Sequence, residues 1–70
     1  MVKVKFKKLN NIVKIEDSEN EELKGKKYFI EFYPFYLNFH KINFDKYYFL
    51  LEDEILNERN EVIGWIKRLE

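Results

Sequence analysis

Eleven of the thirteen aromatic residues of this chain fall in the 22-residue stretch from Tyr28 to Phe49. Each aromatic ring that is buried removes roughly 150–250 Å² of surface from water. Rings at this density therefore form the core of a small domain, or a surface that binds another molecule, or both. The chain has only 70 residues and no cysteine, so disulfides and thiolate metal sites cannot stabilise it. Aromatic packing and self-association are the sources of stability that remain.

The composition predicts a single small domain, residues 1–70, in the cytoplasm. The chain carries 13 basic and 13 acidic residues, and this zero net charge argues against a protein that coats duplex DNA. No apolar run approaches the roughly 18 residues that a membrane-spanning helix needs. The N-terminal segment alternates lysine with apolar residues and lacks the continuous apolar core of a signal peptide. We therefore expect no contact with a membrane.

The N-terminal segment has the alternation of a half-buried β-strand. Residues 2–9 alternate apolar residues with lysine, and residues 12–16 resume the pattern after an Asn-Asn pair. Asparagine tolerates the positive φ angles of a two-residue hairpin turn, so we expect a tight turn that pairs Lys5 with Glu16. This register separates an apolar face from a charged face. The apolar face comprises Val2, Val4, Phe6, Val13 and Ile15, and the charged face comprises Lys3, Lys5, Lys7 and Lys14.

The middle of the chain predicts a short helix followed by a strand. Ser18, with Glu21 three residues later, fits a capping box, and Gly25 fits a helix stop. We therefore expect one or two helical turns from about 19 to 24. Residues 27–33 are rich in aromatic residues and isoleucine, which is typical of a strand.

The C-terminal third allows two structures. A helix from about residue 44 would align apolar residues at a helical spacing, which gives an α+β protein. A hairpin with strands 47–56 and 61–69 and a turn at 57–60 accounts better for Gly64, a poor residue inside a helix. We favour the hairpin. The chain is then mainly β, a small antiparallel sheet or a barrel of the SH3 or OB type, with about five strands and one short helix.

The chain offers no recognisable catalytic or cofactor motif. Ser18 is its only serine and His40 its only histidine. A helix cap explains Ser18 better than nucleophilic catalysis does, and a position in a loop explains His40. The acidic clusters at 16–22 and 52–54 lack the glycine that a calcium-binding loop needs for its sharp turn. We therefore expect no enzymatic activity, no metal site and no cofactor.

Strand periodicity divides the central aromatic residues between two faces. Phe29 and Tyr33 share a face with Glu31, and glutamate is seldom buried unpaired. That face should therefore meet solvent or a partner, and Tyr36 falls on the same side beyond Pro34. The candidate binding patch consists of Phe29, Tyr33 and Tyr36.

These features predict a small non-catalytic module that binds a protein partner or associates with itself through the aromatic patch, as an adaptor or inhibitor would. A subunit of a larger complex would show the same features. The alternative is binding of RNA or single-stranded DNA through a lysine-lined strand and stacking aromatic residues. Its candidate residues are Lys3, Lys5, Lys7 and Lys14. The two functions are separated by whether the lysine face and the exposed aromatic residues share one surface.

Overall fold

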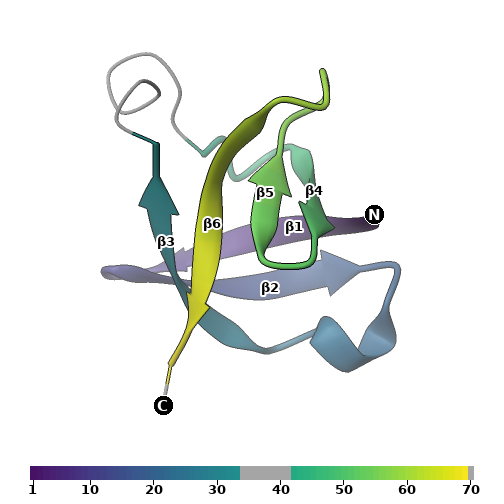
Figure 1. Cartoon of the computed structure of the whole chain (residues 1–70). Helices are drawn as coiled ribbons and strands as arrows, with labels where there is room; N and C mark the ends of the chain where they lie inside the picture. The colour runs from purple at the N-terminus through teal and green to yellow at the C-terminus, as the bar shows by residue number, and fades with distance from the viewer. Residues whose placement is uncertain (34–41, 70) are drawn as a thin grey trace.

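Alternating apolar and polar residues give this chain strands that turn one face towards a shared interior, and these strands close into an antiparallel barrel (Figure 1). The computed structural model describes residues 1–33 and 42–69. Around the barrel the strands follow the order β1-β2-β3-β6-β5-β4, and β4 pairs with β1 to close it. The elements are β1 (Val2–Leu9), β2 (Ile12–Ser18), the 3-10 turn η1 (Glu21–Leu23), β3 (Lys27–Phe32), β4 (Tyr47–Leu51), β5 (Glu54–Leu56) and β6 (Val62–Arg68).

The predicted mainly β fold is confirmed, and the N-terminal hairpin turns where the sequence indicates. Asn10 adopts a positive φ of 57° in the turn between β1 and β2. The predicted pairing of Lys5 with Glu16 is wrong, because a register shift beside Lys5 places it opposite Asp17. Such a bulge adds one residue to one strand and bends it. The inward face of the hairpin is as expected, with Val4, Phe6, Val13 and Ile15 buried and Val2 half-buried.

The helix expected near 19–24 is present as one 3-10 turn, but its cap is Asn20 and not Ser18. The Asn20 side chain accepts a hydrogen bond from the backbone N–H of Glu22 at 3.0 Å. Ser18 is buried, and its Oγ accepts a hydrogen bond from the backbone N–H of Asn20 at 3.0 Å. Gly25 follows the turn with a φ of 85°, a left-handed conformation that glycine adopts without strain.

The C-terminal third consists of strands, so the alternative helix from residue 44 is wrong. The expected strand 47–56 is divided into β4 and β5 by a turn at Glu52-Asp53, which brings the described strands to six. Glu52 adopts a φ of 56°, a conformation that glutamate rarely takes, so Asp53 was the only residue of this turn that favours one. The other expected turn, at 57–60, is present.

The interior of the barrel is filled by side chains from every strand. Two rings of the aromatic stretch, Tyr28 and Tyr48, are buried there with aliphatic residues. The core cluster comprises Val4, Phe6, Val13, Ile15, Tyr28, Tyr48, Leu50, Ile55, Ile63 and Ile66. Within the described ranges, no helix has the length and apolar character needed to cross a membrane.

The barrel also depends on the pairing of β3 with β6, two strands that are far apart in the sequence (Figure 1). Gly64 of β6 lies opposite Phe32 of β3. A Cβ atom at Gly64 would overlap the backbone carbonyl oxygen of Glu31 and lie 3.0 Å from the Cα of Phe32. The two backbones therefore approach more closely here than a residue with a side chain allows.

We expect Gly64→Ala to lower the free energy of unfolding by about 3 kcal/mol, because the added methyl group must push the two backbones apart. Urea unfolding followed by circular dichroism measures this loss. Gly25→Ala is the matched control, since its Cβ would meet nothing within 4 Å and only its positive φ is strained, at a cost of about 1 kcal/mol. Equal losses in the two variants would contradict the close approach at Gly64.

Candidate functional site

The aromatic residues predicted on the polar side of the central strand lie on the outer surface of the barrel. Phe29 is 40% exposed and Tyr33 is 37% exposed, as the position of Glu31 between them indicates. Tyr36, the third residue of the predicted patch, lies outside the described residues. The structure instead adds Trp65, which pairs directly opposite Glu31 across the β3–β6 ladder. We call Phe29, Tyr33 and Trp65 the β3–β6 patch.

The rings of the β3–β6 patch are held by contacts on both strands. The rings of Tyr33 and Trp65 meet edge to face, with 5.0 Å between their centroids and 63° between their planes. The backbone N–H of Tyr33 donates to the carbonyl oxygen of Ile63 at 3.1 Å. Glu31 forms an ion pair of 3.0 Å with Lys67, the residue opposite Phe29. The patch is therefore an ordered surface with one ion pair beside its rings.

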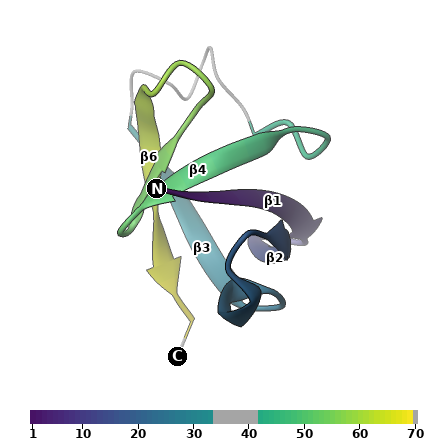
Figure 2. The ribbon, with the colours of Figure 1, turned by 90° about the vertical axis from the view of Figure 1, so that its right-hand side faces the viewer.

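The predicted lysine face divides into two parts. Strand β1 lies between β4 and β2 (Figure 2), and the ammonium groups of Lys3 and Lys5 lie 4.7 Å and 5.8 Å from the ring centroid of Tyr47 on β4. Tyr47 is 39% exposed. Two of the four predicted lysines therefore lie beside an aromatic residue of β4, on the side of β1 opposite to β2.

The other two predicted lysines lie in a row that leads towards the β3–β6 patch. Lys7 of β1 pairs directly with Lys14 of β2, and Lys14 pairs directly with Lys27 of β3. The neighbouring residues Val13 and Tyr28 pair with their side chains buried, so alternation turns Lys14 and Lys27 outward. We call Lys7, Lys14 and Lys27 the lysine row. Lysines and exposed aromatic residues thus share one surface on β3. The lysine that joins them is Lys27, which was not among the residues predicted from the sequence.

The ring of Tyr47 is anchored by Asp17. The Tyr47 hydroxyl donates to Asp17 Oδ2 at 2.7 Å, and this bond holds the pKa of Asp17 below its ordinary value of 3.8. The backbone N–H of Ser18 and the Lys24 ammonium, 3.7 Å from Asp17, act in the same direction. The same carboxylate raises the pKa of Tyr47 above 10.0. The pKa of Lys24 is also raised, chiefly by its hydrogen bond to Glu21.

We expect Tyr47→Phe to raise the pKa of Asp17 towards 3.8, which NMR titration of the side-chain carboxyl carbon measures. A depressed carboxylate pKa stabilises the fold above the unfolded-state value, and this contribution is lost as pH falls through the folded-state value. Wild type should therefore be more stable than Tyr47→Phe above about pH 4, and the difference should vanish in stronger acid. It should also vanish as the pH rises through the raised pKa of Tyr47. A difference that persists in acid would contradict this role of the bond.

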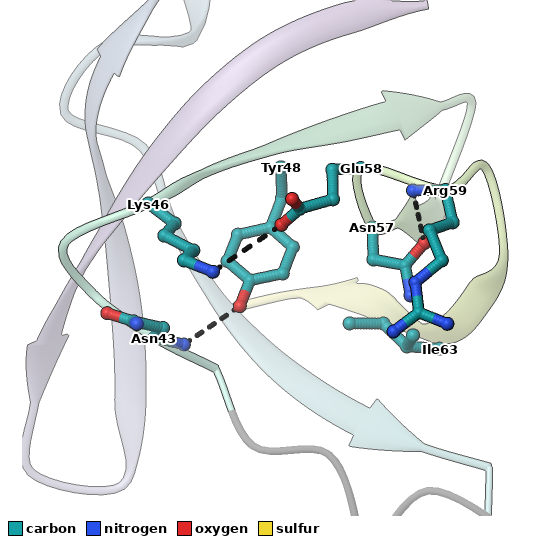
Figure 3. A pocket seen from close by; sticks show the side chains of 7 residues that line it. All are labelled: Asn43, Lys46, Tyr48, Asn57, Glu58, Arg59 and Ile63. Atoms are coloured by element: carbon teal, nitrogen blue, oxygen red, sulfur yellow. Dashed lines mark hydrogen bonds and ion pairs between the residues drawn. The ribbon is translucent and has the colours of Figure 1, made fainter.

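A polar hollow of about 360 Å³ lies between the turn at 43–46 and the turn at 57–60 (Figure 3). The Tyr48 hydroxyl accepts a hydrogen bond from the backbone N–H of Asn43 at 2.9 Å, and Lys46 lies 3.6 Å from Glu58. Its lining residues are Asn43, Lys46, Tyr48, Asn57, Glu58, Arg59 and Ile63. The hydrogen bond and the ion pair hold these turns in place, and we assign the hollow no ligand.

The described structure gives no support for catalysis by Ser18 or His40. The Ser18 hydroxyl is buried and shapes the chain before η1, and His40 lies outside the described residues. In residues 1–33 and 42–69, no group of three histidine, cysteine or acidic residues is placed to hold a metal ion. The surfaces described above are therefore the candidates for function.

Comparisons of the chain with models of protein families, with curated proteins and with solved structures found no match. The two outer surfaces, the β3–β6 patch and the lysine row, are therefore the basis for a proposed function. Sequence reasoning missed Trp65, although a signal was present: Trp65 alternates with Ile66 and falls on the same strand face as Lys67. The strand alternation that predicts a solvent-facing position for Phe29, next to Glu31, also predicts one for Trp65, next to Lys67.

Proposed function

We propose that this chain is a small non-catalytic protein-binding module that uses the β3–β6 patch. The observation that supports this function best is the edge-to-face pair of Tyr33 and Trp65 on the outer surface, beside the exposed ring of Phe29. Tryptophan and tyrosine are enriched among the residues that dominate binding energy in protein interfaces. They bring a large apolar area together with a polar edge that tolerates water.

The rigidity of the β3–β6 patch also favours binding. Each side chain that is immobilised on association costs about 0.5–1.5 kcal/mol of conformational entropy. Here Tyr33 and Trp65 already contact each other. Trp65 lies in the paired strand β6, and the backbone N–H of Tyr33 donates to the carbonyl oxygen of Ile63. Part of that cost is therefore met when the barrel folds, and a partner gains more of the burial energy of the rings.

A second copy of the chain is one partner that this surface suits. Glu31 and Lys67 carry opposite charges beside the rings, 3.0 Å apart. In a two-fold interface the same patch meets itself, so Glu31 of each copy can approach Lys67 of the other. A chain of this size also has a thin margin of stability, which association increases.

We expect the double variant Phe29→Ser/Tyr33→Ser, and separately Trp65→Ser, to weaken association at least about 10-fold, as loss of a dominant interface residue does. Sedimentation velocity measures self-association, and affinity capture from the source cells, quantified by mass spectrometry, measures other partners. Tyr47→Ser is the matched control, because Tyr47 is 39% exposed against 37% for Tyr33 but lies on β4.

Circular dichroism spectra first establish that each variant is folded. Equal effects of the β3–β6 variants and the Tyr47 control would contradict the assignment of the patch. A wild-type chain that stays monomeric and captures nothing that the patch variants fail to capture would overturn the proposed function.

A further inference from the structure

We propose that the barrel has a second binding site, in which the lysine row binds the phosphate groups of single-stranded nucleic acid. The row consists of Lys7, Lys14 and Lys27, which are directly paired on the neighbouring strands β1, β2 and β3. Directly paired residues have Cβ atoms about 4.5–5.5 Å apart, so three ammonium groups can reach one chain of phosphates. This proposal concerns a different ligand, and its surface shares only Phe29 with the β3–β6 patch.

The lysine row is unfavourable in the absence of an anion. Like charges directly opposite each other destabilise a sheet. Lys14, in the middle, is half-buried, so its charge is less well screened by water. In the part of the chain that the structure describes, the ion pairs involve Lys24, Lys46 and Lys67, and none involves the row. A bound phosphate chain would supply the missing negative charge.

A hollow of about 350 Å³ continues the positive surface beyond Lys27. Three cations line it: Lys26, Lys27 and Arg68. Arg68 reaches this place because it pairs opposite Tyr28, where the end of β6 meets the start of β3 (Figure 1). The other lining residues are Gly25, Tyr28 and Leu69, so the described lining holds no acid. The row and the hollow meet at Lys27, and together they hold five cations.

The exposed ring of Phe29 favours single-stranded nucleic acid over other polyanions. Phe29 lies two residues beyond Lys27 on the same face of β3 and pairs opposite Lys67. A base can stack on such a ring only when it is free of its own duplex, and base–aromatic stacking is worth about 1–3 kcal/mol per base. An acidic peptide would form ion pairs with the lysines but has no base to stack on the ring of Phe29. Single-stranded nucleic acid can pair its phosphates with the lysines and stack a base on the ring.

The site differs from the lysine set that the sequence predicts. Lys3 and Lys5 lie over the ring of Tyr47, and Lys5 pairs opposite Asp17, whose carboxylate reduces the positive potential there. Lys27 replaces them, because strand pairing places it opposite Lys14, and the hollow adds Lys26 and Arg68. The zero net charge of the chain is compatible with this site, since its acids concentrate at 16–22 and 52–54.

Fluorescence anisotropy with a labelled single-stranded oligothymidylate tests the site. We expect Lys7→Gln/Lys14→Gln/Lys27→Gln to bind at least about 10-fold more weakly than wild type at low salt. The slope of log K against log salt is negative, and its magnitude should fall by about 2, since each lost phosphate contact contributes roughly 0.7 for single strands. The control Lys3→Gln/Lys5→Gln/Lys46→Gln removes the same charge elsewhere and should weaken binding less than about 3-fold.

Phe29→Ser should weaken binding of the oligonucleotide and leave binding of inorganic polyphosphate unchanged.

Should the triple variant fail to fold, NMR titration of the wild-type chain gives the answer, because backbone amide shifts should concentrate at the lysine row. Absence of binding by wild type at low salt, or equal weakening by the two triple variants, would overturn the proposal. Equal affinity for polyglutamate or for duplex DNA would overturn the choice of ligand. Neither result touches the Trp65 variants, which test the protein-binding function separately.

Discussion

The close backbone contact at Gly64 is the constraint on which the β3–β6 patch depends. It allows β3 and β6 to pair from Tyr28–Arg68 to Phe32–Gly64. That ladder places Trp65 beside Tyr33 and carries Arg68 to the start of β3. A side chain at Gly64 would separate the strands at the Phe32 end of the ladder, next to Tyr33 and Trp65. The glycine is therefore needed for the shape of the β3–β6 patch, although it does not belong to it.

Strand alternation gives the aromatic residues two separate roles. The buried rings of Tyr28 and Tyr48 fill the barrel, and their neighbours Phe29 and Tyr47 point outward and are about two-fifths exposed. The inward rings add to a core that aliphatic residues also fill, in a chain without disulfides. Single exposed apolar residues need no functional explanation, and Tyr47 is held by Asp17. The rings gathered in the β3–β6 patch do call for one.

Local patterns in the sequence predicted local structure well. The Asn-Asn turn, the alternation of lysine with apolar residues and the outward position of Phe29 all depend on neighbours within one or two strands. The break at Glu52-Asp53 was missed because glutamate rarely takes the positive φ found there and Asp53 alone was a weak turn signal. Long-range pairing was missed for a similar reason. Nothing near Lys27 in the sequence shows that it lies beside Lys14, and nothing near Trp65 shows that it meets Tyr33.

The lysine row shows how a chain of zero net charge can hold a strongly positive surface. Strand register, and not composition, places Lys7, Lys14 and Lys27 side by side, while the acids concentrate in the turns and at the bulge. The arrangement lowers the stability of the fold, because the three ammonium groups repel one another. This repulsion is strongest at low salt and at the half-buried Lys14. Any anion that binds the folded row and not the unfolded chain removes this repulsion. It therefore stabilises the barrel by an amount that grows with the logarithm of the ratio of anion concentration to Kd, so that binding and folding are linked through the same three side chains.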